Sequence, residues 1–284
     1  CFARLFCAVR FRFRRGKENT LVDVKPPFVV IGNHTCNYDF LFAAALLPRV
    51  RIHFVVGVYY FCNRFLAPIL RYFGCISKYQ FQADVASVRS MAAVIKRGGC
   101  VGIYPQGQVP SDGSVGYIPP GIGKLLKLLK VPVVAVRVNG GFLSSPKWAK
   151  NGRFGKVEAK AFSVLSQEDV QKLSVEEINR RVYQALDFND YEWQKSHGYL
   201  YRGRNLAENI EKILYKCPCC GAEFQMASKG ADFWCGACGG RGRVSKTGML
   251  ESKDFPYTSP YDWCMWQKAV VREESVQPDF ALSS

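Results

Sequence analysis

The segment Asn33–Asp39, with the sequence NHTCNYD, contains a histidine and an aspartate five residues apart. If His34 lies in a turn after a strand and Asp39 in the first turn of the next helix, the carboxylate can fold back onto the imidazole. A carboxylate on one ring nitrogen fixes the tautomer and leaves the other nitrogen free as a general base. Taken alone, the spacing also suits a turn histidine beside a helix-capping aspartate, which is the commoner arrangement.

A cluster of cysteines near the carboxyl end suggests metal chemistry. Two Cys-x-x-Cys-Gly segments place Cys217, Cys220, Cys235 and Cys238 in two pairs separated by 14 residues, which is the pattern of a zinc ribbon. Four thiolates form a closed tetrahedral site with no position for water, so this zinc is expected to be structural. Cys219 is the spare thiol of the cluster. The other seven of the 12 cysteines are scattered, which favours a reducing compartment.

The elements that must position His34 repeat a strand–turn–helix pattern. A buried strand is expected over 28–31 and leads to His34, and another over 100–104 leads to Gln106 and Gly107. Strands that alternate with helices predict an α/β fold with a mixed, largely parallel sheet flanked by helices. Because ligands bind at the carboxyl ends of such strands, His34 and Gln106 are expected to share one edge of the sheet.

Apolar periodicity and capping residues predict the remaining elements. Strands are expected over 52–58 and 131–138. Helices are expected over 39–47, 59–73 with an interruption at Pro68, from Asp84 to Gly98, over 121–130, after Ser174, and over 205–216.

Changes in composition divide the chain into four segments. Residues 1–24 are basic and amphipathic, because Phe2, Leu5, Phe6, Val9 and Phe13 fall on one helical face; this helix either packs on the core or contacts a membrane surface. Residues 25–216 form the α/β domain, 217–246 the zinc ribbon, and 247–284 an aromatic tail that packs on the domain.

The positive charge is confined to the first half of the chain. Residues 1–150 contain 21 Lys and Arg against 5 Asp and Glu, whereas residues 151–284 contain 18 of each. A one-sided positive field predicts an anionic partner, such as nucleic acid, an anionic bilayer or a phosphorylated substrate. The longest stretch without a charged residue is 98–111, which is too short to span a membrane. A hydrophobic content of 48% excludes intrinsic disorder.

Four segments follow one another in a recognisable order. They are NHTCNYD at 33–39, GCISK at 74–78, YPQGQVPS at 104–111 and VPVVAV at 131–136. This order resembles that of the 1-acylglycerol-3-phosphate acyltransferase family, also called lysophospholipid acyltransferases. The family's first block reads Asn-His-x-Ser-x-x-Asp, its second contains Gly-x-Ile before a basic residue, its third is Phe-Pro-Glu-Gly-x-Arg-Ser, and its fourth is an apolar strand with proline.

The resemblance implies transfer of a fatty acyl group from acyl-CoA or acyl carrier protein to a hydroxyl of a lysophospholipid, in phospholipid biosynthesis. It implies that His34 is the general base and that Asp39 holds its ring. The substrate-binding residues implied by the matching blocks are Asn33, Lys78, Gln106, Gly107 and Pro132, with backbone N–H groups around Gly107 as oxyanion donors. The expected partner is an anionic membrane surface, contacted on its cytoplasmic face by a peripheral or monotopic protein.

Two residues of the third block depart from the family. Gln106 stands where the family has Glu, and Val109 where it has Arg; those charged residues are thought to engage the glycerol phosphate. These departures bear on which lipid serves as the acyl acceptor rather than on the acyl-transfer reaction itself. Cys36 is interpreted as a small residue in the Ser position rather than as a nucleophile.

Two alternatives stay open: a catalytically silent lipid-binding relative, and a zinc-ribbon protein that binds nucleic acid. The second expects positive charge on or beside the ribbon, and residues 217–246 contain only four basic residues against two acidic ones.

Overall fold

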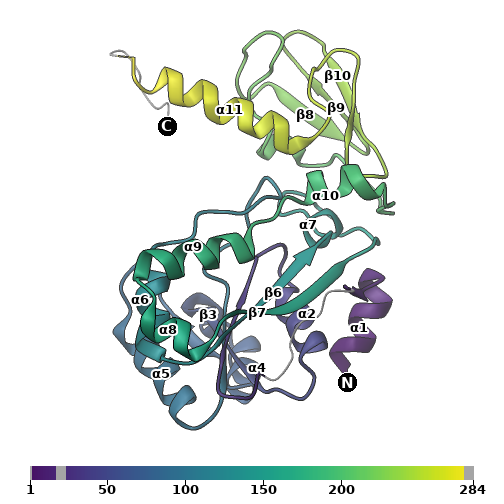
Figure 1. Ribbon diagram of the computed structural model, residues 1–284. Coiled ribbons are helices and arrows are strands. Elements are labelled where there is room, and N and C mark those ends of the chain that lie inside the picture. Colours follow the sequence, from purple (N-terminus) through teal and green to yellow (C-terminus); the bar gives the residue numbers. More distant parts are fainter. Residues whose placement is uncertain (1, 17–23, 278–284) are drawn as a thin grey trace. The chain divides into compact units, whose positions relative to one another are not determined.

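The computed structural model describes residues 2–16 and 24–277 and divides into two compact units (Figure 1). Unit 1 consists of Cys1–Pro110, Val115–Gly141 and Val157–Asn189. Unit 2 consists of Ser111–Ser114, Phe142–Lys156 and Asp190–Ser284.

Unit 1 is built on a seven-stranded sheet in the order β1-β7-β6-β2-β5-β3-β4. The strands are β1 (Arg14–Arg15), β2 (Val29–Gly32), β3 (Ile52–Gly57), β4 (Ile76–Lys78), β5 (Cys100–Ile103), β6 (Val133–Asn139) and β7 (Glu158–Leu165). Every neighbouring pair is parallel except β6 and β7, which are antiparallel. The predicted mixed, largely parallel sheet is therefore confirmed.

Helices cover both faces of this sheet (Figure 1). The helices of one face are α1 (Phe2–Phe11) and α2 (Asp39–Leu46), and those of the other are α5 (Val85–Lys96), α6 (Gly121–Leu129), α8 (Gln167–Lys172) and α9 (Val175–Leu186). Strand β2 shows why both faces are apolar. Val30 packs in the cluster of the first face, whereas Val29 and Ile31 pack in the cluster of the second.

Three helical expectations need correction. The predicted helix over 59–73 is two helices, α3 (Val58–Phe61) and α4 (Leu66–Tyr72), with Pro68 in the first turn of α4, where its missing N–H costs nothing. The predicted helix over 205–216 is wrong: only the single turn η1 (Ile210–Lys212) forms, because Asn205 and Asn209 adopt positive φ angles of 56° and 74°. The third concerns which face of α1 packs on the core. Leu5 and Val9 of the expected apolar face are exposed, and the helix buries Cys7 and Phe11 instead.

Unit 2 contains the cysteine cluster and a four-stranded antiparallel sheet in the order β11-β10-β9-β8. Its strands are β8 (Met226–Lys229), β9 (Asp232–Cys235), β10 (Arg241–Val244) and β11 (Leu250–Glu251), and the other helices are α7 (Gly141–Ser144), α10 (Asp190–His197) and α11 (Pro260–Glu274). Phe255 and Trp263 of the aromatic tail pack against Phe233 of the ribbon sheet. Over residues 2–16 and 24–277, no helix is both long and apolar enough to cross a membrane.

Candidate active site and metal centre

His34 lies in the turn between β2 and α2, and Asp39 is the first residue of α2. The turn brings their side chains into contact: Nδ1 of His34 lies 2.7 Å from Oδ2 of Asp39. Asp39 is 1% exposed and the His34 side chain is 22% exposed. The structure thus contains the buried carboxylate and partly open imidazole that the sequence spacing allows.

The turn that precedes α2 holds the Asp39 carboxylate in place. Oδ2 accepts hydrogen bonds from the backbone N–H groups of Thr35 and Cys36, at 2.6 and 3.0 Å, and Oδ1 accepts one from the Thr35 hydroxyl at 2.5 Å. These hydrogen bonds and the positive end of the helix hold the carboxylate in this position. An ionised carboxylate only accepts, so Nδ1 of His34 must carry the ring proton. Nε2 is then the basic nitrogen, and it forms no hydrogen bond with any described residue.

Gln106 joins this site from the end of the neighbouring strand β5. The backbone N–H of His34 donates to Oε1 of Gln106 at 3.2 Å. Because that N–H can only donate, the atom facing it must be the oxygen, which fixes the orientation of the amide. Nε2 of Gln106 has no hydrogen-bond partner among the described residues, although the side chain is only 4% exposed. A buried N–H donor without a partner costs about 1–3 kcal/mol, so it is suited to an oxygen of a bound substrate.

Gly107 shapes the loop but does not supply the expected oxyanion donor. Its φ is 73°, and its N–H donates to the carbonyl of Tyr104 at 3.0 Å. Its own carbonyl accepts a hydrogen bond from the side-chain amide of Gln80. The N–H of Gly107 is therefore occupied in the turn, and the side chain of Gln106 is a further donor that this loop offers.

An aromatic wall beside His34 was missed at the level of sequence. The ring of Tyr104 lies 5.0 Å from the imidazole and stacks on Phe54, at 6.2 Å between centroids. Burial, together with the nearby Asp39 charge, raises the pKa of Tyr104 well above its ordinary value, so the phenol stays neutral. A Cβ at Gly32 would lie only 2.4 Å from this ring. The pairing of Gly32 with an aromatic residue before Pro105 is the sequence signal that could have revealed the wall.

The other three residues expected to bind substrate have different positions. Asn33 ties the end of β2 to β6, because its side chain both donates to and accepts from the backbone of Val138 at 2.8 Å. Lys78 ends β4 at the same edge of the sheet, and its ammonium donates to the carbonyls of Tyr79 and Gln82. Pro132 immediately precedes β6 and accepts a hydrogen bond from the N–H of Val29. It therefore lies at the amino edge of the sheet, opposite to His34, and the structure does not bring it into the site.

Cys36 is buried beside the dyad rather than presented to a substrate. Its thiol lies 3.6 Å from Oδ1 of Asp39. Burial, reinforced by the Asp39 charge, raises the pKa of Cys36 well above its ordinary value. A protonated, enclosed thiol is a poor nucleophile, which agrees with its interpretation as a small residue in the Ser position.

Residues 12–139 match the family model described as Acyltransferase. The matched region includes His34, Asp39 and Gln106, and it ends at the last residue of β6. Among solved structures, the chain is similar to the 1-acyl-sn-glycerophosphate (LPA) acyltransferase PlsC from Thermotoga maritima. That comparison has a TM-score of 0.47 and 22% sequence identity, and it covers 61% of this chain and 71% of the other. None of the curated proteins compared with the chain matches it.

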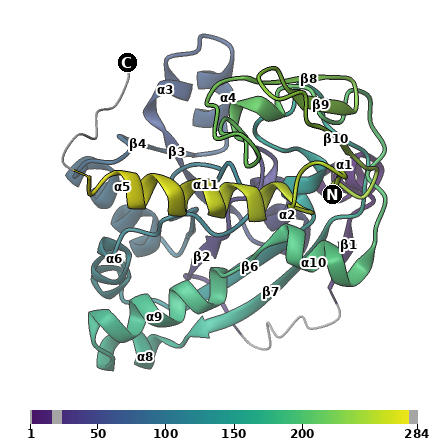
Figure 2. The same ribbon diagram turned by 90° about the horizontal axis from the view of Figure 1, so that it is seen from above.

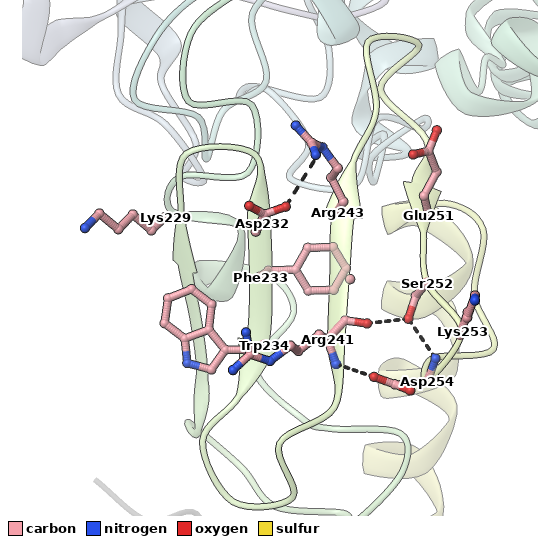
Figure 3. Close-up of a pocket in the computed structure, with 11 residues that line it drawn as sticks. Lys229, Asp232, Phe233, Trp234, Arg241, Arg243, Glu251, Ser252, Lys253 and Asp254 are labelled. Carbon is pink, nitrogen blue, oxygen red and sulfur yellow. Dashed lines mark hydrogen bonds and ion pairs between the residues drawn. The ribbon is translucent and has the colours of Figure 1, made fainter.

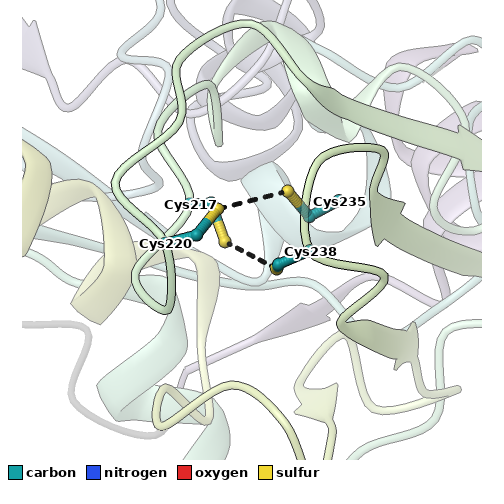
Figure 4. Close-up of side chains that lie close together, drawn as sticks. All are labelled: Cys217, Cys220, Cys235 and Cys238. Carbon is teal, nitrogen blue, oxygen red and sulfur yellow. Dashed lines mark hydrogen bonds between the residues drawn. The ribbon is translucent and has the colours of Figure 1, made fainter.

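The four cysteines of unit 2 have the geometry of a metal centre (Figure 4). The sulfur atoms of Cys217, Cys220, Cys235 and Cys238 all lie within 4.8 Å of one another. Two of the separations are 3.7 and 3.8 Å, and tetrahedral zinc with Zn–S bonds of about 2.3 Å requires about 3.8 Å between sulfurs. The cluster therefore fits a zinc ion held by four thiolates.

Two equivalent turns build this centre. The N–H of Gly221 donates to the carbonyl of Cys217, and the N–H of Gly239 to that of Cys235, both at 3.0 Å. Both glycines have positive φ angles, 73° and 78°, which explains the Gly after each Cys-x-x-Cys. Cys219 lies outside the cluster, and its thiol donates to the carbonyl of Asp254.

A separate open pocket lies on the ribbon sheet (Figure 3). Its charged lining residues are Lys229, Asp232, Arg241, Arg243, Glu251, Lys253 and Asp254. Arg243 lies 3.9 Å from the Asp232 carboxylate, and Asp254 accepts from the backbone of Arg241. Four basic and three acidic side chains make this surface mixed in sign, whereas a nucleic-acid site is expected to be predominantly basic.

Proposed function

We propose that this chain is an O-acyltransferase of the 1-acylglycerol-3-phosphate acyltransferase type, which moves a fatty acyl group from a thioester to a lipid hydroxyl. One observation carries the proposal. A histidine with a carboxylate on Nδ1 lies beside a buried amide donor, inside the region that matches the acyltransferase family model, and neither its Nε2 nor that amide N–H has a partner among the residues that the structure describes.

The proposed reaction steps follow from the orientation of the His34 ring, which Asp39 fixes. Nε2 of His34 takes the proton of the acceptor hydroxyl while its oxygen attacks the thioester carbonyl carbon. Asp39 keeps the ring oriented and stabilises the imidazolium that forms. The tetrahedral intermediate then collapses, the carbon–sulfur bond breaks, and the leaving thiolate takes the proton back from Nε2. No covalent acyl-enzyme is needed.

In this chain, Gln106 supplies a hydrogen-bond donor that suits the transition state of this reaction. Negative charge develops on the carbonyl oxygen in the transition state, and a donor fixed in advance lowers its energy. The amide of Gln106 is fixed by its bond from His34 N–H, and its Nε2 is left with a hydrogen to donate. We assign this donor to the oxyanion in place of the N–H of Gly107.

The proposed substrates are acyl-CoA or an acyl carrier protein as the donor and a lysophospholipid as the acceptor, in phospholipid biosynthesis. The excess of basic residues in the first 150 positions suits phosphate groups on both substrates and an anionic membrane surface. The protein would act as a peripheral or monotopic enzyme on the cytoplasmic face of the membrane. The zinc centre, lying in unit 2, has no part in the proposed steps and stabilises the ribbon.

Release of free thiol from a long-chain acyl-CoA, and in parallel from an acylated acyl carrier protein, tests the proposal, with a panel of lysophospholipids and other lipid alcohols as acceptors. His34→Ala is expected to lower acceptor-dependent release by about 10²–10⁴-fold. The matched control is His197→Ala, which removes an exposed histidine of unit 2 and should retain wild-type activity. Release that is independent of the acceptor, or that survives in His34→Ala, contradicts the mechanism. No release with any acceptor and either donor favours a silent lipid-binding relative.

A further inference from the structure

Exposed apolar side chains gather on the two short helices that follow β3. Helices α3 and α4 lie side by side (Figure 2). Their large exposed residues are Tyr59, Tyr60, Phe65, Ile69 and Tyr72, followed by Phe73, with exposed fractions from 37 to 79%. These six residues are here called the α3–α4 surface. In a water-soluble domain, such side chains are normally buried, and a group of them marks a contact site.

The charge around this surface has one sign. No Asp or Glu occurs between Asp39 and Asp84, a stretch of 44 residues that contains Arg49, Arg51, Arg64, Arg71 and Lys78. None of the four arginines forms an ion pair with a described residue, whereas Lys78 interacts electrostatically with the carboxylate of Asp84 at the end of this stretch. The guanidinium of Arg64 lies over the ring of Phe65, 5.0 Å from its centroid. The guanidinium of Arg51 donates to the backbone carbonyl of Tyr72, so unpaired arginines lie beside the α3–α4 surface at two of its six residues.

We propose that the α3–α4 surface docks on an anionic lipid bilayer. Tyrosine and phenylalanine rings insert at the boundary between headgroups and acyl chains, and arginines reach the lipid phosphates. Contact with a second copy of the chain is disfavoured, because it would bring four unpaired arginines against four others. The site thus takes a lipid surface with phosphate headgroups and an apolar interior.

Docking here would bring the proposed active site next to lipid. The ring of Tyr59 packs over Gly57, and the side chain of Gln80 lies 3.5 Å from the position that a Cβ of Gly57 would occupy. Gln80 in turn donates to the carbonyl of Gly107. Phe81 lies 3.8 Å from the corresponding Cβ position at Gly107. The surface and the catalytic loop are thus joined through the side chains of Gln80 and Phe81, so that, on the proposed function, docking would bring the bilayer surface close to the catalytic loop.

Flotation of the full-length, zinc-loaded protein with unilamellar vesicles tests the proposal. Vesicles of phosphatidylcholine alone are compared with vesicles of phosphatidylcholine and phosphatidylglycerol in a 3:1 ratio. Arg64→Gln with Arg71→Gln is expected to lower partitioning to the anionic vesicles about 30-fold at low salt. Phe65→Ser with Tyr72→Ser should lower partitioning to both kinds of vesicle. The matched controls are Lys124→Gln with Lys130→Gln, and Leu128→Ser, which alter exposed residues on or next to α6 and should bind like the wild type.

Each outcome decides for or against the surface. Equal binding by the wild type and both α3–α4 variants, or equal loss in the α6 controls, overturns the proposal. A dimer in light scattering that the α3–α4 variants abolish also overturns it, in favour of a second copy. His34→Ala must bind vesicles like the wild type, because binding does not depend on turnover. If the wild type transfers no acyl group but the variants lose vesicle binding as expected, the docking surface stands and the proposed function fails.

Discussion

Asp39→Asn separates the charge of the dyad from its geometry. The backbone N–H groups of Thr35 and Cys36 both point at Oδ2, at 2.6 and 3.0 Å. Since these groups can only donate, the asparagine must place its oxygen at that position. His34 Nδ1 then still faces an oxygen, and the new amide group faces the Thr35 hydroxyl, which can accept. The substitution is therefore expected to retain the ring orientation and the tautomer while the negative charge is lost.

The expected loss of activity is correspondingly small. A hydrogen bond to a charged partner contributes about 1–2 kcal/mol more than one to a neutral partner, which corresponds to a loss of roughly 5- to 30-fold in kcat. Loss of the carboxylate at the amino end of α2 should lower the free energy of unfolding by about 0.3–1 kcal/mol. Asp39→Ala provides the contrast. It leaves two buried N–H groups unpartnered, at about 1–3 kcal/mol each, and should destabilise the protein clearly.

The measurement is kcat for acceptor-dependent thiol release, together with the free energy of unfolding in urea, for the wild type and both variants. A loss of about 10³-fold or more in Asp39→Asn with nearly unchanged stability would refute the reasoning, because it would mean that the tautomer had been lost. Wild-type activity in Asp39→Ala would show that the carboxylate does not serve His34 at all.

Three further measurements test other parts of the structure. Gln106→Glu keeps an oxygen for His34 N–H but replaces the free donor, so kcat/KM should fall by roughly 10- to 150-fold, equivalent to about 1.5–3 kcal/mol; unchanged kinetics would remove Gln106 from the site. In the zinc-loaded protein, an alkylating reagent should modify the exposed Cys62 and Cys219, as detected by mass spectrometry. After a chelator has removed the zinc, the reagent should also modify the four ligand cysteines, while the sheet of unit 1 persists. Loss of the whole fold would instead make the ribbon part of the core. Burial raises the pKa of Cys7 from 9.0 to about 12. The stabilisation by the neutral thiol is therefore complete below pH 9 and is lost toward pH 12, at up to about 1.4 kcal/mol per pH unit. In urea unfolding, Cys7→Ala should lack this decrease of the free energy of unfolding with pH.

The four central strands of unit 1, β6, β2, β5 and β3, were accessible to sequence reasoning because their signals are local, whereas β1, β4 and β7 were not predicted. Apolar strands, the N-cap at Asp84 and the glycine after α5 each depend on a few neighbouring residues. Asp84 accepts from the N–H of Ser87, as its position predicts, and Gly98 has a φ of 81°. The contact of His34 with Asp39 was accessible for the same reason, since one turn closes it.

What could not be predicted depends on pairing across long distances. The place of Pro132 follows from the register of β6 against β2, in which Val133 pairs with Val29, so a family motif is not always a site residue. The role of Asn33 follows from Val138, 105 positions away. The helix predicted over 205–216 is reduced to the single turn η1 because Asn205 and Asn209 adopt left-handed backbone conformations, which the sequence pattern does not reveal.

The two departures of the third block acquire a common physical meaning in this site. Glu and Arg would carry opposite charges, so their replacement by Gln106 and Val109 leaves the net charge of the loop unchanged while removing the charged contacts. Val109 is buried at 8% exposure and offers no donor. The ammonium of Lys78 already donates to two carbonyls. Recognition of a terminal phosphate through bidentate arginine contacts is thus absent from the described part of this loop, whereas His34, Asp39 and the free amide of Gln106 retain what a hydroxyl and a thioester require.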